Sequence, residues 1–408
     1  MLSGKILDGY AELVIRLGVN LQNGQGLEIS CPVEKREVAQ ALCEAAYRAG
    51  AKIVRVRWND EIIDKLGYEY ADTSALTEIP KWFVDSKNYL VENGFCYVAV
   101  AAEDPSIFNG IPSEKLAAVA RAKSKALKKF SDSVMANGVR WCVVSVPTEA
   151  WAKQVFPNAE NPLEELSNAI EKTMRLDGIN PLKLWEEHIS ELDRHAKFLN
   201  DKNFEYLHFR SSSGTDLKIG LANEHVWLSA REVAKDGLPF IANMPTEEVF
   251  TAPHRLKADG ILKSALPLAL NGQIIDDFSI TFEKGKIIDY SAKIGYGALK
   301  NLIETDEGTL RLGEVALIGK NSPIAKSGIL FYNTLFDENA SCHLAIGKAY
   351  PTTVKDGDKL SLKELKEKGL NDSVEHVDFM IGTSDLSVIG IDANGNETPV
   401  FIDGDWAI

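Results

Sequence analysis

The sequence contains few cysteines and no long apolar run. Its cysteines lie far apart without a CxxC pair, which excludes a zinc-finger protein and indicates reduced thiols in a cytosol (Cys31, Cys43, Cys96, Cys142 and Cys342). No window approaches about 18 uninterrupted apolar residues, so we expect no membrane span. The N-terminal segment mixes polar and apolar residues with a helical period, so we expect no signal peptide and a cytoplasmic protein.

Basic residues are outnumbered by acidic ones. The chain has 45 Lys and Arg against 59 Asp and Glu, a formal net charge of -14. Nucleic-acid-binding proteins usually carry a basic face, so this balance argues against a nucleic-acid partner. The strand-end loops of the first half lack GxGxxG and GxxxxGK(S/T), and the short Gly24–Gly26 stretch does not replace them, so no nucleotide site is predicted. A negative surface can instead draw metal cations or cationic ligands inward.

The length of 408 residues predicts two or three domains. In the first half, short strand-like runs alternate with segments of helical period, which is typical of a mostly parallel sheet flanked by helices. We predict strands at Gly26–Cys31, Lys52–Trp58, Cys96–Ala101 and Trp141–Val146. We predict helices between them at Glu34–Ala51, Pro80–Glu92 and Ser113–Asn137, and after them at Leu163–Arg175 and Pro181–Asn200.

The character of the chain changes after about Phe204, where short strands follow one another between turn signals such as Asn271 and Gly272. The prediction is therefore an α/β N-terminal domain over residues 1–200 and a β-rich α+β C-terminal domain over residues 201–408. The first of the seven histidines is His188. The α/β half is thus a poor place for a histidine-bound metal, and we expect such a site in the C-terminal domain.

Four phrases of the second half are dense in polar residues. They are Asn243–Pro253 with Glu247 and Glu248, Arg311–Ile318 with Glu314, Gly328–Tyr350 with Glu338, His343 and Tyr350, and Val374–Met380 with His376 and Asp378. Each phrase also has a purely structural interpretation when it is taken alone. The adjacent glutamates could lie in a solvated turn, and Glu314 could lie on an edge strand that faces water. His343 could be a core histidine whose hydrogen bonds go to the backbone. The HxD pair, His376 and Asp378, could lie on a solvated strand face.

Local geometry favours convergence within two of these phrases. A helix that begins near Asn339 would place His343 and Tyr350 two turns apart on one face. In a strand, His376 and Asp378 would point to the same face because they are two residues apart. A carboxylate inside an apolar run, such as Glu314, must be paired, protonated or bound to a cation, because burying it alone costs several kcal/mol.

Taken together, three carboxylates and two imidazoles can supply the ligands of a pair of metal ions. Two ions roughly 3.5–4 Å apart polarise a carbonyl and create a hydroxide at neutral pH. Spacing alone does not prove that the four phrases meet in space. Two other interpretations therefore stay open: a two-metal hydrolase of another amide or ester, and a non-enzymatic α/β binding protein whose polar phrases are structural.

At these phrases the sequence resembles the aminopeptidase T / aminopeptidase S family of two-metal aminopeptidases. The resemblance spans the whole chain and is carried by NMPTEEVFTAP, GEVAL, SGILFYNTLFDENASCHLAIGKAY and EHVDFMIG. It implies a metallo-aminopeptidase that removes N-terminal residues from peptides with a free N-terminus, by means of a hydroxide that two metal ions activate. It implies metal ligands at Glu248, Glu314, His343, His376 and Asp378.

The resemblance also assigns roles within this set. The second glutamate position of TEEVF is Glu248, and Glu314 is the candidate for a bridging ligand. Tyr350 matches a tyrosine at the metal centre that acts as a ligand or as a donor to the reacting carbonyl. Glu338 is either a further ligand or a group that orients a histidine, and Glu247 or Glu338 would shuttle the proton.

The resemblance further implies a homodimer with an enclosed substrate cavity. Each subunit is expected to hold two divalent ions, with zinc, cobalt, magnesium or manganese as candidates. One position departs from the family pattern, because His254 follows the TAP triplet where an aspartate often stands. The departure lies outside the ligand set, so it bears on specificity more than on activity.

Overall fold

The computed structural model describes residues 4–102 and 104–408. The chain divides into two compact units. One unit runs to Ser190 and includes Ala230–Thr246, and the other consists of Glu191–Ser229 and Glu247–Ile408. The chain therefore passes between the units three times, whereas the sequence suggested a single boundary near residue 200. The reason is strand pairing, because β9 (Asn243–Met244) joins the sheet of the first unit.

The sheet of the first unit has the order β2-β1-β3-β4-β9, and every neighbouring pair in it is parallel. Its first four strands confirm the sequence prediction, with bounds β1 Gly26–Pro32, β2 Ile53–Asn59, β3 Cys96–Val100 and β4 Trp141–Val144. Leu27, Ile29 and Val98 are fully buried, as expected for strands covered by helices on both faces. A short hairpin of β7 (Arg231–Val233) and β8 (Pro239–Ile241) also belongs to this unit.

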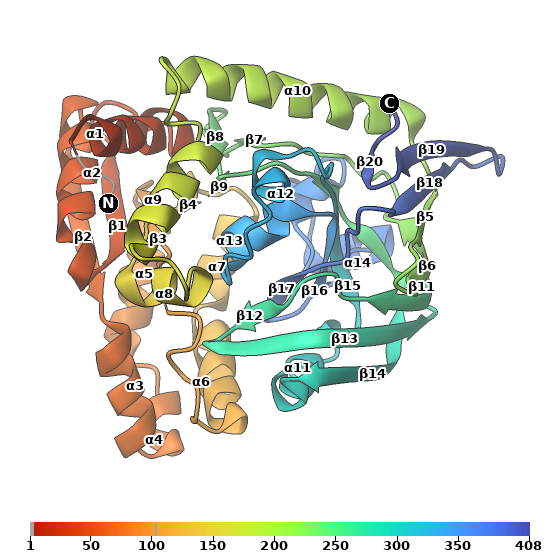
Figure 1. Cartoon of the computed structure of the whole chain (residues 1–408), viewed down its shortest axis with the longest axis horizontal. Coiled ribbons are helices and arrows are strands. Elements are labelled where there is room, and N and C mark those ends of the chain that lie inside the picture. The colour runs from red at the N-terminus through yellow and green to blue at the C-terminus, as the bar shows by residue number, and fades with distance from the viewer. Residues whose placement is uncertain (1–3, 103) are drawn as a thin grey trace. The chain divides into compact units, whose positions relative to one another are not determined.

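Helices flank this sheet, as the alternating pattern predicts (Figure 1). The predicted helix over Ser113–Asn137 is divided in two, because α6 ends at Ala126 and α7 begins at Lys128. The helices are α1 Gly4–Leu13 with a π-helical turn over Val14–Gly18, α2 Arg36–Arg48, α3 Glu61–Tyr70, α4 Thr73–Thr77, α5 Lys81–Glu92, α6 Ser113–Ala126, α7 Lys128–Met135, α8 Glu149–Val155, α9 Pro162–Thr173 and α10 Pro181–Lys202, which reaches into the second unit.

The second unit is rich in antiparallel strands, which confirms the predicted β-rich α+β half. Its larger sheet has the order β12-β13-β11-β6-β5-β18-β19-β20, with β14 on β13. These strands are β5 Tyr206–Arg210, β6 Asp216–Leu221, β11 Pro253–Lys263, β12 Leu268–Leu270, β13 Gln273–Glu283, β14 Lys286–Ile294, β18 Ser387–Ile391, β19 Glu397–Ile402 and β20 Asp405–Trp406. The helices are α11 Tyr296–Ile303, α12 Pro323–Ser327, α13 Thr334–Asp337 and α14 Leu362–Lys368.

A smaller antiparallel sheet of the second unit carries the polar phrases. It has the order β10-β15-β16-β17, with β10 at Val249–Thr251, β15 at Leu312–Leu317, β16 at His343–Gly347 and β17 at His376–Met380. In Figure 1, β15, β16 and β17 lie side by side. Every residue of β15 and β16 is buried. This sheet is the core element that positions the site.

One local expectation and one alternative structural interpretation are wrong. His343 opens strand β16 and does not lie on a helix, so His343 and Tyr350 are not two helical turns apart. The helical turns end earlier, at Ala340, because pairing with β15 and β17 fixes the following residues as a central strand. Glu314 is likewise on an interior strand and not on a water-facing edge.

Among the described residues, no helix is long and apolar enough to cross a membrane.

Candidate metal centre

The strand register brings the candidate ligands to one face of the β10-β15-β16-β17 sheet. Glu314 lies opposite Ala345, and Ala345 lies opposite Asp378 on the next strand. His376 lies opposite Gly347 in the same way. Because residues opposite each other in an antiparallel pair share a face, and residues two apart in a strand do too, these side chains converge. Glu248 joins them from the residue that precedes β10.

The positions between the ligands are small. Ala316 is opposite His343, Ala345 separates Glu314 from Asp378, and Gly347 is opposite His376. Gly347 has a φ of +105°, and a Cβ there would meet the Glu375 carbonyl oxygen at 2.2 Å, so the backbone itself requires glycine at this position. Polar ligand candidates therefore alternate with small residues in an otherwise apolar, buried sheet.

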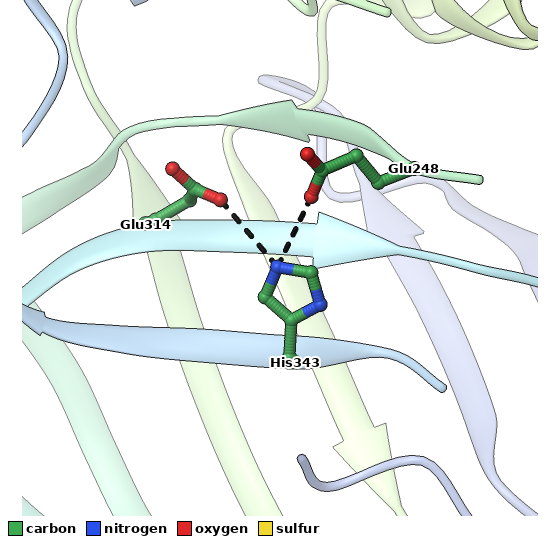
Figure 2. Close-up of side chains that lie close together, drawn as sticks. All are labelled: Glu248, Glu314 and His343. Carbon is green, nitrogen blue, oxygen red and sulfur yellow. Dashed lines mark ion pairs between the residues drawn. The ribbon is translucent and has the colours of Figure 1, made fainter. Parts of the chain in front are cut away.

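Two groups of ligand atoms share Glu314. Figure 2 shows Glu248, Glu314 and His343 pointing toward one another, with His343 Nε2 3.1 Å from Glu248 Oε2 and 3.5 Å from Glu314 Oε1. On the other side, His376 Nε2 lies 3.7 Å from Glu314 Oε2 and 3.4 Å from Asp378 Oδ1. In each group the ligand atoms lie within 4.8 Å of one another. The two oxygens of Glu314 thus face different histidines.

Backbone carbonyls orient both imidazoles. His343 Nδ1 donates to the Glu338 carbonyl at 2.9 Å, and His376 Nδ1 donates to the Lys348 carbonyl at 2.6 Å. These hydrogen bonds place the proton on Nδ1 and leave Nε2 of each ring directed at the carboxylates. A histidine that binds a metal through one ring nitrogen commonly donates from the other in this way.

Glu314, Glu338 and His343 have strongly shifted pKa values. Burial raises the pKa of Glu314 to about 7. Burial and the charge of Asp378 raise the pKa of Glu338 well above its ordinary value. Burial by itself lowers the pKa of His343, but hydrogen bonds to Glu248 and Glu314 raise it well above its ordinary value. Carboxylates crowded together and out of water need protons or cations to neutralise them.

The donor set suits divalent cations. Each group offers one imidazole nitrogen and carboxylate oxygens, a combination that binds Zn, Co or Mn. Within residues 4–102 and 104–408, Asp378 Oδ1 is a buried oxygen that accepts no hydrogen bond of good geometry. Buried oxygens are rarely left in that condition without a compensating cation or donor. The donor atoms of the two groups therefore fit divalent metal.

Metal-free protein is expected to lose stability as the pH rises from 5 to 9. Folding raises the pKa of Glu314 from 4.5 to about 7 and that of His376 from 6.5 to about 10. For both groups the folded state holds the proton longer than the unfolded chain, so the free energy of unfolding falls between the two pKa values. Asp378 has the opposite shift, which acts only near and below pH 3.8.

Thermal unfolding of chelated protein at pH 5, 7 and 9 checks this expectation. With metal bound, the decline should be smaller, because the cation takes the place of the protons. A His376→Asn variant should show a flatter decline between pH 7 and 9 in the chelated state. A Tm of chelated protein that increases over this range would contradict the proposed balance of charges.

The remaining residues named from the sequence also lie at the site. The Tyr350 ring lies edge-on to the His376 ring, with centroids 5.0 Å apart. Glu338 is buried next to the ligands but lies outside the two groups, and its backbone carbonyl orients His343. The Glu338 side chain accepts a hydrogen bond from Asn339 Nδ2 at 3.4 Å. Glu247 is buried as well, so the glutamate pair is not a solvated turn.

Two further residues hold parts of the site in place, and the sequence alone gave no role to either of them. Asn339 is fully buried, and its Oδ1 accepts the Glu247 backbone N–H at 2.7 Å, which holds the TEEVF phrase beside β16. Its place within the long polar phrase was the available signal. Lys348 orients His376 through its carbonyl. A backbone role does not depend on the side chain, so the sequence carries no signal for it.

Known proteins share this chain's sequence and fold. The profile of the thermophilic metalloprotease (M29) family matches residues 4–406. Aminopeptidase AmpS of Bacillus subtilis (strain 168) is 42% identical over 403 residues, covering 98% of each chain, and aminopeptidase T of Thermus aquaticus is 37% identical over 404 residues with the same coverage. Among solved structures, wild-type AmpT from Thermus thermophilus has a TM-score of 0.90 at 35% identity and covers 99% of each chain.

A more distant structure shares the fold alone. It is a 2,5-dihydroxypyridine dioxygenase from Pseudomonas putida KT2440, with a TM-score of 0.50 and 13% identity over 98% of this chain. Fold similarity at this level says nothing of chemistry. The full-length profile match and the aminopeptidase relatives, together with the convergent ligand face, settle the relationship: the chain belongs to the thermophilic metalloprotease (M29) family.

Proposed function

We propose that this chain is a metal-dependent aminopeptidase that removes the N-terminal residue of peptides at the Glu314-centred site. The observation that carries the proposal is the sharing of Glu314 by two groups of ligands, one with Glu248 and His343 and the other with His376 and Asp378. Relatives at 36–42% identity over nearly the whole chain are named aminopeptidases.

Two cations held by these groups would supply Lewis acidity for the scissile carbonyl and lower the pKa of water. The chain's own residues position the reactants. Glu314 fixes the spacing of the two ligand groups because its oxygens face both histidines. We infer that Tyr350, whose ring lies edge-on to His376, would donate to the oxyanion that develops on the substrate. A buried carboxylate, Glu247 or Glu338, would carry the proton to the leaving amine.

The expected substrate is a peptide with a free α-amine, because the carboxylates around the site attract a cationic group. Zinc, cobalt, magnesium and manganese all remain candidates for the two ions. A homodimer and a cytoplasmic location are further expectations of the family resemblance. No nucleic acid and no membrane is expected among the partners.

An amine-blocking comparison tests this function. Metal-loaded protein is expected to hydrolyse leucyl p-nitroanilide and to leave N-acetyl-leucyl p-nitroanilide uncleaved, because acetylation removes the charge of the amine. The activity should vanish on chelation and return on adding one of the four metals. Equal cleavage of both substrates would favour a different amide or ester hydrolase. Purified protein that binds no metal and shows no thermal shift with metal would favour a binding protein.

A further inference from the structure

A short turn between helix α13 and strand β16 contains a fully buried amide side chain. The turn covers Glu338–Ala340, and its middle residue is Asn339. The Asn339 backbone carbonyl accepts a hydrogen bond from Ser322 Oγ at 3.2 Å, and Asn339 Nδ2 donates to the Leu335 carbonyl at 2.9 Å. Both partners lie outside the two ligand groups. The position of the turn is therefore fixed by contacts that do not involve a ligand candidate.

This turn contacts two chain segments that supply ligands to the group drawn in Figure 2. The Glu338 carbonyl accepts from His343 Nδ1 at 2.9 Å, and Asn339 Oδ1 accepts from the Glu247 backbone N–H at 2.7 Å. Glu247 directly precedes Glu248, whose Oε2 lies 3.1 Å from His343 Nε2. Two ligand candidates from distant parts of the chain are thus anchored to neighbouring residues of one turn.

Strand pairing constrains these two ligand candidates unequally. His343 opens β16 and is paired with a strand on each side, β15 and β17. Glu248 precedes β10, and the pairing of β10 with β15 begins only at Val249. The hydrogen bond from the Glu247 N–H to Asn339 therefore anchors the chain on the side of Glu248 that the sheet does not hold. Loss of this bond should affect Glu248 more than His343.

We propose that Asn339 is a positioning residue that aligns Glu248 with His343 for metal binding. A side-chain amide suits this task because it carries an acceptor and donors together. Its Oδ1 and Nδ2 each have a backbone partner, at Glu247 and Leu335, so the amide cannot turn without losing both hydrogen bonds. The inference rests on the proposed function, which requires metal at this ligand group, but its test measures metal binding and not peptide cleavage.

Two substitutions of Asn339 separate metal binding from folding. Asn339→Leu removes the acceptor of the Glu247 N–H, and calorimetric titration of the chelated protein with Zn²⁺ should show roughly 10–100-fold weaker binding than wild type. Asn339→Asp keeps an oxygen for this N–H but loses the donor to the Leu335 carbonyl. It should bind Zn²⁺ with nearly wild-type affinity, because its added charge does not oppose a cation, although its Tm without metal falls.

The matched control is Asn200→Leu on α10. Asn200 makes the same pair of hydrogen bonds with the Trp227 backbone, accepting from its N–H at 2.8 Å and donating to its carbonyl at 2.9 Å, but it holds no ligand segment. This control should lower the Tm and leave the affinity for Zn²⁺ unchanged. Asn339→Ala removes the same acceptor without added bulk and replaces Asn339→Leu if the larger side chain prevents folding.

Two results would overturn the positioning role. One is wild-type affinity for Zn²⁺ in folded Asn339→Leu or Asn339→Ala, and the other is an equal loss of affinity in Asn339→Leu and Asn339→Asp. Failure of the proposed function looks different, because wild-type protein would then bind Zn²⁺ and cleave no aminoacyl substrate. The affinities of the variants would still support or refute the role of Asn339 in that case.

Discussion

Glu314→Gln is expected to lower kcat/KM by more than the roughly 10–100-fold that follows loss of a group that only orients a metal ligand. Glu314 belongs to both ligand groups, with one oxygen 3.5 Å from His343 Nε2 and the other 3.7 Å from His376 Nε2. Glutamine keeps the shape of the side chain but removes its negative charge, so metal held by either ligand group would lose a carboxylate ligand. Steady-state kinetics and metal content per subunit measure the effect.

The same variant should separate metal binding from folding. Without metal, Glu314→Gln is expected to be at least as stable as wild type, because it removes a buried carboxyl whose pKa burial raises to about 7. Its thermal shift on adding metal should be smaller, since a hundredfold loss in affinity at saturating metal removes about 2.7 kcal/mol of stabilisation. Glu367→Gln, at an exposed carboxylate of α14, is the control. Near-normal turnover of metal-loaded Glu314→Gln would contradict the shared role.

Glu338→Gln is expected to reduce kcat by about 10²–10⁴-fold, the usual contribution of a general acid or base. Glu338 is buried, and burial together with the charge of Asp378 raises its pKa well above the ordinary value. Burial and the neighbouring charge therefore favour the protonated form of this carboxyl. The change leaves in place the backbone carbonyl that accepts the His343 Nδ1 proton, so the imidazole should keep its orientation.

Two further measurements distinguish proton transfer from metal binding at Glu338. If the side chain moves a proton, the variant should keep its metal content and KM, and the pH dependence of kcat should lose one limb. If the side chain is a further ligand, metal content and thermal shift should fall together with kcat. Retention of full activity by Glu338→Gln would remove it from both roles, and the Asn339 contact would then be its remaining function.

Helices and strands could be predicted from the sequence where the local residue pattern favours the same conformation as the tertiary packing. The β-branched run at Ile53–Asn59 and the helical period at Arg36–Arg48 appear as β2 and α2. The same agreement made the HxD geometry correct, because His376 and Asp378 do lie two apart on strand β17. In these segments the side chains favour the conformation that packing also demands.

Prediction failed where pairing with distant strands overrides local preference. The residues after Ala340 resemble the continuation of a helix, yet His343–Gly347 forms a central strand between β15 and β17. The two-residue strand Asn243–Met244 has no periodicity of its own, and it exists because β4 offers an open edge. That pairing assigns the start of the Asn243–Pro253 phrase to the first unit, whereas Glu247 and Glu248 belong to the second. Short pairings of this kind depend on partners that the local sequence does not contain.

The sequence by itself determined which side chains can bind metal. A chain without CxxC pairs, without early histidines and with four polar phrases in its second half restricts the chemistry to carboxylates and imidazoles, and the family resemblance selects five of them. Only the tertiary structure decided that these five meet as two groups around Glu314. The physical reason is register. The β10-β15-β16-β17 pairing, with Ala345 between Glu314 and Asp378, brings distant residues onto one buried face, and no local pattern specifies that alignment.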